Sequence, residues 1–104
     1  MTGRKLFIEP EAHLARKTLP GNVRQRLKQA IESLMTDPRP PQSRPLETSG
    51  IDVPEGVELR RLRIDPWRLV YAIKEAEGWV WVLAIRRRPP YEYQDLKVLT
   101  EKLE

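Results

Sequence analysis

The spacing of apolar residues divides this 104-residue chain into a helical half and a strand half. Five apolar residues recur at intervals of three and four: Val23, Leu27, Ala30, Ile31 and Leu34. This spacing predicts an amphipathic helix over about 21–36. Asp37-Pro38 should end it, because the residue before a proline avoids helical backbone angles. A short strand at 5–8 and a weaker helix at 11–17 are predicted before it.

The second half predicts three strands, at about 57–64, 67–75 and 78–86. Glu75-Ala76-Glu77-Gly78 should link the last two as a tight hairpin. Apolar residues occupy both alternating sets of these two strands, so we expect at least partial cover on both faces. One set is Leu69, Tyr71 and Ile73 with Trp79, Trp81, Leu83 and Ile85, and the other is Val70 and Ala72 with Val80, Val82 and Ala84.

The element order β-α-α-β-β-β predicts an α+β fold over a single domain, residues 1–104. We expect a small antiparallel sheet with the two N-terminal helices packed on one face and the first strand at an edge. Residues 38–56, rich in proline, are predicted to form a long surface loop. Residues 93–103 are predicted to form a short amphipathic C-terminal helix.

Composition excludes several kinds of site. There is no cysteine and only one histidine, which excludes disulfides, thiolate metal sites and histidine-based metal sites. Carboxylates are not clustered in the sequence, so neither a metal nor another cofactor is expected. No apolar run approaches the length of a membrane span, and the first residues do not resemble a signal peptide. We therefore expect a cytoplasmic protein that does not contact membranes.

The positive charge is concentrated in the strand half. The formal net charge is +4, and more than half of the arginines fall within 59–71 and 80–93. Residues 86–88 are all arginine. A local basic patch is typical of proteins that bind nucleic acid or an acidic protein.

Strand geometry predicts that several of these arginines meet. Alternation places Arg61 and Arg63 on one side of their strand. Antiparallel pairing brings the start of strand 67–75 beside the end of strand 78–86, so Arg68 should lie near Arg86–Arg88. Gathered guanidinium groups could hold a phosphodiester and stabilise charge that develops on its oxygens.

Two tyrosines and three acids lie near these arginines in the sequence, and they allow two interpretations of the arginines. Tyr91 and Tyr93 could stack on a base, as aromatic residues do in RNA recognition. The alternative is that the arginines only cap strand ends and pair with Glu58, Asp65 or Glu92.

Three segments, in this order and spacing, resemble one known family. They are Ile-Glu-Ser-Leu-Met-Thr-Asp-Pro-Arg-Pro-Pro at 31–41, Leu-Arg-Arg-Leu-Arg-Ile-Asp-Pro-Trp-Arg-Leu-Val-Tyr-Ala-Ile at 59–73, and Val-Leu-Ala-Ile-Arg-Arg-Arg-Pro-Pro-Tyr at 82–91. The family is the RelE/ParE superfamily of bacterial toxins, and the resemblance extends from about Leu6 to Tyr93.

The resemblance implies a toxin of a type II toxin–antitoxin pair. RelE-like members enter the ribosomal A site and cut mRNA: the 2′-hydroxyl attacks the adjacent phosphate and leaves a cyclic phosphate. It thus implies a metal-independent endoribonuclease that inhibits translation, with a cognate antitoxin, the ribosome and mRNA as partners. Two alternatives remain open: a ParE-like inhibitor of DNA gyrase, or a degenerate module that only binds an antitoxin.

The resemblance also implies roles for single residues. The implied catalytic residues are Arg61, Arg68, Arg88 and Tyr91. The implied substrate-binding residues are Arg63, Arg86, Arg87 and Tyr93. If the alignment with the family is shifted by one residue, Arg87 takes the role of Arg88. Tyr93 is the alternative to Tyr91.

The general base is not identified by the resemblance. Some relatives carry a glutamate where this chain has Arg44, and an arginine cannot realistically accept a proton. Glu58, Glu92 and Tyr91 are the candidates.

Overall fold

The computed structural model describes residues 4–46, 52–64, 66–87 and 103. Its elements, in chain order, are β1 (Lys5–Ile8), α1 (Pro10–Lys17), α2 (Gly21–Ser33), β2 (Ser43–Pro45), β3 (Val57–Ile64), β4 (Trp67–Lys74), the 3-10 turn η1 (Glu75–Glu77) and β5 (Trp79–Arg87). The predicted helix at 93–103 lies outside the described residues.

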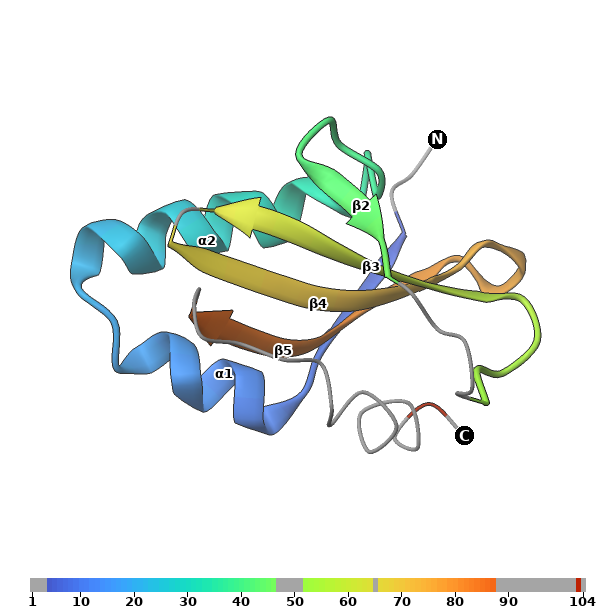
Figure 1. The fold of residues 1–104 in the computed structure, drawn as a ribbon, viewed down its shortest axis with the longest axis horizontal. Helices are drawn as coiled ribbons and strands as arrows, with labels where there is room; N and C mark the ends of the chain where they lie inside the picture. Colours follow the sequence, from blue (N-terminus) through green and yellow to red (C-terminus); the bar gives the residue numbers. More distant parts are fainter. Residues whose placement is uncertain (1–3, 47–51, 65, 88–102, 104) are drawn as a thin grey trace.

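The strands form one five-stranded sheet in the order β1-β5-β4-β3-β2 (Figure 1). The expected α+β class and the edge position of β1 are confirmed. Two details differ from the prediction. The sheet is mixed, because β1 runs parallel to β5 while the other pairs are antiparallel. The proline-rich segment also contributes the edge strand β2, whose three residues are too few to show an alternating pattern.

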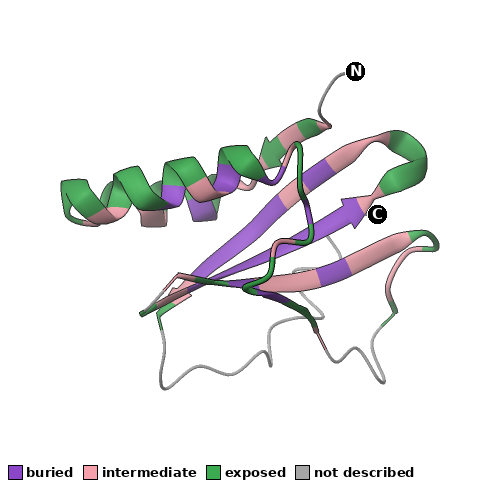
Figure 2. Cartoon of the chain, turned by 90° about the horizontal axis from the view of Figure 1, so that it is seen from above, coloured by how far each residue is buried: buried purple, intermediate pink, exposed green. Residues whose placement is uncertain are grey.

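Both helices pack on the same face of the sheet, as predicted. Their buried residues Ala12, Leu27, Ile31 and Leu34 form one core with strand residues such as Tyr71. In Figure 2, α2 lies along that face with its buried positions toward the strands. The Tyr71 hydroxyl donates a 2.6 Å hydrogen bond to the carbonyl of Pro38, which ties the segment after α2 to the sheet. Burial raises the pKa of this tyrosine above its usual value.

The opposite face carries a second apolar cluster, so the central strands are buried on both sides, as the sequence predicted. Its buried members are Leu59, Val70, Ala72, Leu83 and Ala84. We call the two sides the helix face and the second face.

An irregularity in the β4–β5 pairing changes the predicted alternation. Val70 pairs with Ala84 and Tyr71 pairs with Val82, so Leu83 is an extra residue in β5. An extra residue shifts every later side chain to the other face. Ile85 therefore packs in the helix-face core with Leu69, Tyr71 and Ile73. Trp79, Trp81 and Leu83, predicted in the same set, pack in the cluster on the opposite face, so that part of the predicted alternation is wrong. The same shift decides which face each terminal arginine of β5 occupies.

Among the described residues, no helix is both long and apolar enough to cross a membrane.

A candidate phosphate-binding site on the second face

Three arginines form a row across the central strands. Arg63 of β3 pairs in register with Arg68 of β4, and Arg68 pairs with Arg86 of β5. Residues paired across neighbouring strands project to the same face. The register therefore places arginine side chains of three strands side by side on one face of the sheet.

Two more arginines extend the row toward the edge strand. Arg61 lies two residues before Arg63 and so shares its face, and it pairs in register with Arg44 of β2. We call Arg44, Arg61, Arg63, Arg68 and Arg86 the arginine face. Sequence reasoning placed Arg44 in a loop and gave it no binding role. The role of Arg44 depends on the three-residue strand β2, which the sequence pattern did not predict.

A cavity of about 260 Å³ opens at the β2 side of the arginine face. It is lined by Arg44, Arg61 and Arg63 together with Pro41 and Gln42. The Nη1 atom of Arg44 donates 2.8 Å hydrogen bonds to the carbonyls of Pro41 and Ser43, which fix the side chain against its own strand. Guanidinium groups around one cavity provide several directed donors for phosphate oxygens.

Arg68 is the buried member, with only 2% of its surface exposed. Its Nη1 atom donates a 3.1 Å hydrogen bond to the carbonyl of Trp67. A guanidinium cannot shed its proton in a protein, so this position stays positively charged. A positive charge held in a largely dry environment acts more strongly on a nearby anion than an exposed one does.

Arg87 lies apart from the arginine face. It pairs in register with Trp67 and its guanidinium carbon lies 5.8 Å from the centre of a Trp67 ring. Trp67 packs against the helix-face core, so Arg87 is on the helix face. Arg88, Tyr91 and Tyr93, the other predicted site residues, lie outside the described residues.

A second group of arginines serves the fold. Glu58 and Glu75 lie between Arg4, Arg39 and Arg60, and we call these five residues the ion-pair network. Arg39 bonds to Glu58 at 2.7 Å and to Glu75 at 2.8 Å. Arg60 bonds to Glu58 at 2.6 Å, and Arg4 bonds to Glu75 at 2.8 Å. The network joins the residue before β1, the turn η1 and the strand β3 to the segment after α2.

The ion-pair network removes Glu58 from the candidates for a general base. Glu58 is paired on the helix-face side of β3, where its register partner is Ile73. Burial alone would raise the pKa of Glu58, but hydrogen bonds from Arg39 and Arg60 hold it below its usual value. A carboxylate stabilised in this way is a weak base, and it points away from the arginine face.

A metal centre is not indicated by the described part of the chain. There, no group of three histidine, cysteine, aspartate or glutamate side chains could hold a metal ion. The positive charge at the arginine face comes from the guanidinium groups themselves.

Comparison with known proteins identifies one matching family. The model described as the ParE toxin of the type II toxin–antitoxin system, parDE, matches residues 8–89. No curated protein sequence matches the chain significantly.

Three solved structures are similar in fold. The archaeal RelE–RelB complex from Pyrococcus horikoshii OT3 shares 20% identity over 86% of this chain and 99% of that chain, with a TM-score of 0.73. The RelBE2 toxin–antitoxin complex from Mycobacterium tuberculosis shares 19% identity over 83% and 99%, with a TM-score of 0.64. The isolated E. coli RelE toxin shares 21% identity over 97% and 99%, with a TM-score of 0.61.

Proposed function

This chain belongs to the ParE toxin family of type II toxin–antitoxin systems, and we propose that it is a ribosome-dependent endonuclease that cuts mRNA. The observation that carries the proposal is the register of Arg63, Arg68 and Arg86, with Arg61 beside them. Such a surface suits the phosphates of an extended RNA strand.

In the proposed reaction the 2′-oxygen of a nucleotide attacks the adjacent phosphorus, and the bond from phosphorus to the 5′-oxygen breaks. The products are a cyclic phosphate and a 5′-hydroxyl. Negative charge grows on the non-bridging oxygens, where Arg68 would stabilise it. Arg61 and Arg63 would hold the phosphate in line, and Arg86 would hold a neighbouring one. We propose the same assistance from Arg88, with Tyr91 or Tyr93 stacking on a base.

The proton of the 2′-hydroxyl needs an acceptor other than Glu58. Glu92 and Tyr91 stay as predicted candidates outside the described residues. Orientation of the attack and neutralisation of charge can supply a large part of such catalysis. Arginine-based stabilisation of this kind requires no metal ion.

We further propose that a cognate antitoxin neutralises this toxin. Two of the similar structures are toxin–antitoxin complexes, which supports such a partner. The ribosome and mRNA as targets would place the active protein in the cytoplasm.

The test is in vitro translation with primer extension on the message. We expect ribosome-dependent cuts with the unaltered protein and a loss of roughly 100- to 1,000-fold with Arg68→Ala, the cost of removing one transition-state donor. Arg87→Ala is the control, because it removes an arginine from the helix face. Ribosome-dependent cuts that persist undiminished in Arg68→Ala would refute the proposed role of Arg68.

Inhibition of DNA gyrase is the second candidate function. It is favoured by the family model, which describes a ParE toxin, and by the loss of Glu58 as a base. A supercoiling assay with purified gyrase distinguishes the two. Inhibition of supercoiling without cuts in the message would replace the nuclease proposal with gyrase inhibition. A protein that binds an antitoxin but does not arrest the growth of cells that express it would be a degenerate binding module.

A further inference from the structure

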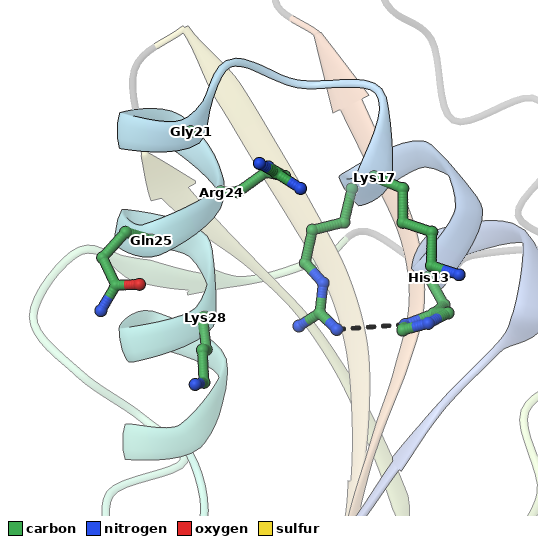
Figure 3. A pocket seen from close by; sticks show the side chains of 7 residues that line it. His13, Lys17, Gly21, Arg24, Gln25 and Lys28 are labelled. Carbon is green, nitrogen blue, oxygen red and sulfur yellow. Dashed lines mark hydrogen bonds between the residues drawn. The ribbon is translucent and has the colours of Figure 1, made fainter.

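A second positively charged cavity lies between α1 and α2, and its lining shares no residue with the arginine face. Its volume is about 310 Å³, and its lining is His13, Arg16 and Lys17 from α1 with Gly21, Arg24, Gln25 and Lys28 from α2. In Figure 3, Arg24 extends from α2 toward α1 across the space that these side chains surround. Neither the proposed reaction nor the core uses these residues.

Helical spacing explains why these side chains face one another. The lining residues of α1 are separated by three and four positions, and so are those of α2, which puts each set on one stripe of its helix. The apolar stripe of α2, with Leu27 and Ile31, turns instead to the sheet. The two polar stripes therefore form the walls of one groove between the helices.

The groove holds positive charge that the described carboxylates do not neutralise. Every ion pair found among the described residues belongs to Arg4, Arg39, Arg60 or Lys74. Arg16 instead donates a 3.0 Å bond to Nδ1 of His13, which accepts only when that nitrogen carries no proton (Figure 3). Arg16, Lys17, Arg24 and Lys28 thus contribute four positive charges to one cavity.

The position of Arg24 works against helix electrostatics. The N-terminal end of a helix carries partial positive charge and favours acidic residues. The first turn of α2 has no acidic residue, and no side chain caps its N-terminus. The guanidinium of Arg24 folds back over that turn, since its Nη2 atom lies 3.9 Å from where a Cβ on Gly21 would be. A cation held there without a carboxylate favours an external anion.

We propose that this groove binds the phosphate backbone of nucleic acid. The lining contains no apolar side chain, whereas a bound peptide is usually anchored by buried aromatic or aliphatic residues. Phosphate binding needs only cations and backbone donors. Cations on two helices suit consecutive phosphates of a polynucleotide better than one isolated phosphate ion. The groove would hold a nucleic acid independently of the arginine face.

The test measures binding of fluorescently labelled 16-base-pair RNA and DNA duplexes as a function of salt. Arg24→Gln/Lys28→Gln should weaken binding at least 10-fold at 100 mM salt. It should also lower the slope of log Kd against log salt by about 1.8, the value for two lost phosphate contacts on a duplex. The control is Lys5→Gln/Arg26→Gln, which removes two exposed charges outside the groove. The two duplexes show whether the groove prefers RNA or DNA.

Three outcomes would overturn the proposal. The first is an equal loss of duplex affinity in both double variants. The second is no duplex binding by the unaltered protein. The third is displacement of the duplex by a poly-glutamate peptide that binds the groove more tightly. The nuclease proposal is judged by message cleavage with Arg68→Ala and the groove proposal by duplex binding with Arg24→Gln/Lys28→Gln, so the failure of one is distinguishable from the failure of the other.

Discussion

The ion-pair network and the arginine face use the same residue type in opposite ways. In the network, arginines alternate with Glu58 and Glu75, and the charges compensate one another. On the arginine face, the cross-strand neighbour of Arg63 or Arg44 is another arginine. Arginine count alone therefore says little about function. The two groups differ in their neighbours: each network arginine contacts a carboxylate, whereas arginines of the arginine face are paired in register with other arginines.

The largest expected effect comes from the arginine face. Arg63→Ala should lower the rate of message cleavage roughly 10- to 100-fold, the value of a hydrogen bond to a charged group. Its urea unfolding midpoint should change little, since Arg63 is exposed. Primer extension and urea titration on the same preparation measure both. Unchanged cleavage would remove Arg63 from the site.

A change in the ion-pair network should lower stability and leave cleavage unchanged. Glu58→Gln keeps the side-chain shape but removes the charge between Arg39 and Arg60. We expect a loss of about 1–2 kcal/mol in the free energy of unfolding, because Arg60 is largely buried and loses its charged partner. Cleavage per folded molecule should not change. A large loss of cleavage without loss of stability would return Glu58 to the candidates for the general base.

Sequence patterns predicted the elements better than their connections. The helical spacing of Leu27, Ile31 and Leu34 identified α2, because burial on one side of a helix imposes its period. The apolar runs identified β4 and β5, because these strands are buried on both faces. The parallel direction of β1 could not be read from a four-residue strand. The extra residue at Leu83 was also hidden, since apolar residues lie on both sides of it.

Only part of the arginine face could be predicted from the sequence. Strand alternation placed Arg61 and Arg63 together, and antiparallel pairing placed Arg68 beside Arg86. Arg87 was grouped with them although adjacent strand residues project to opposite faces. Arg44 went unrecognised as a member, because its side-chain direction depends on a β2–β3 pairing that local sequence does not encode.

The pH dependence of stability gives a smaller test of the network. Hydrogen bonds from Arg4 and then Arg39 lower the pKa of Glu75 from 4.5 to about 2. A carboxyl whose pKa is lowered by folding stabilises the protein above its unfolded pKa, and this contribution is lost as pH falls from about 4.5 to about 2. The amount should be below about 1 kcal/mol, because Glu75 is half exposed and screened by solvent.

Glu75→Gln should therefore flatten the acid side of the stability profile. Urea midpoints between pH 6 and pH 2 measure the effect. Glu32→Gln is the matched control, because Glu32 is an exposed acid on α2 outside the network. If the two variants show the same stability profile, ionised Glu75 does not stabilise the protein through the network.

The smallest expected effect concerns Arg87. Arg87→Ala removes the cation–π contact with Trp67 and should cost about 0.5–1 kcal/mol of stability. Thermal unfolding measures this loss, and Trp67→Leu should make it disappear. Cleavage should remain within about two-fold of the unaltered protein. A larger loss of cleavage would mean that Arg87 reaches the substrate from the helix face.

The central claim is that the arginine face binds a nucleotide backbone as one surface. The most direct measurement is the salt dependence of affinity for a single-stranded RNA whose 2′-hydroxyls are methylated, so that it cannot be cut. Arg61→Gln/Arg63→Gln should lower the slope of log Kd against log salt by about 1.4, the value for two lost contacts on a single strand. Lys5→Gln/Arg87→Gln, which removes two exposed positive charges outside the arginine face, should leave the slope nearly unchanged. Equal slopes in the two variants would contradict the account.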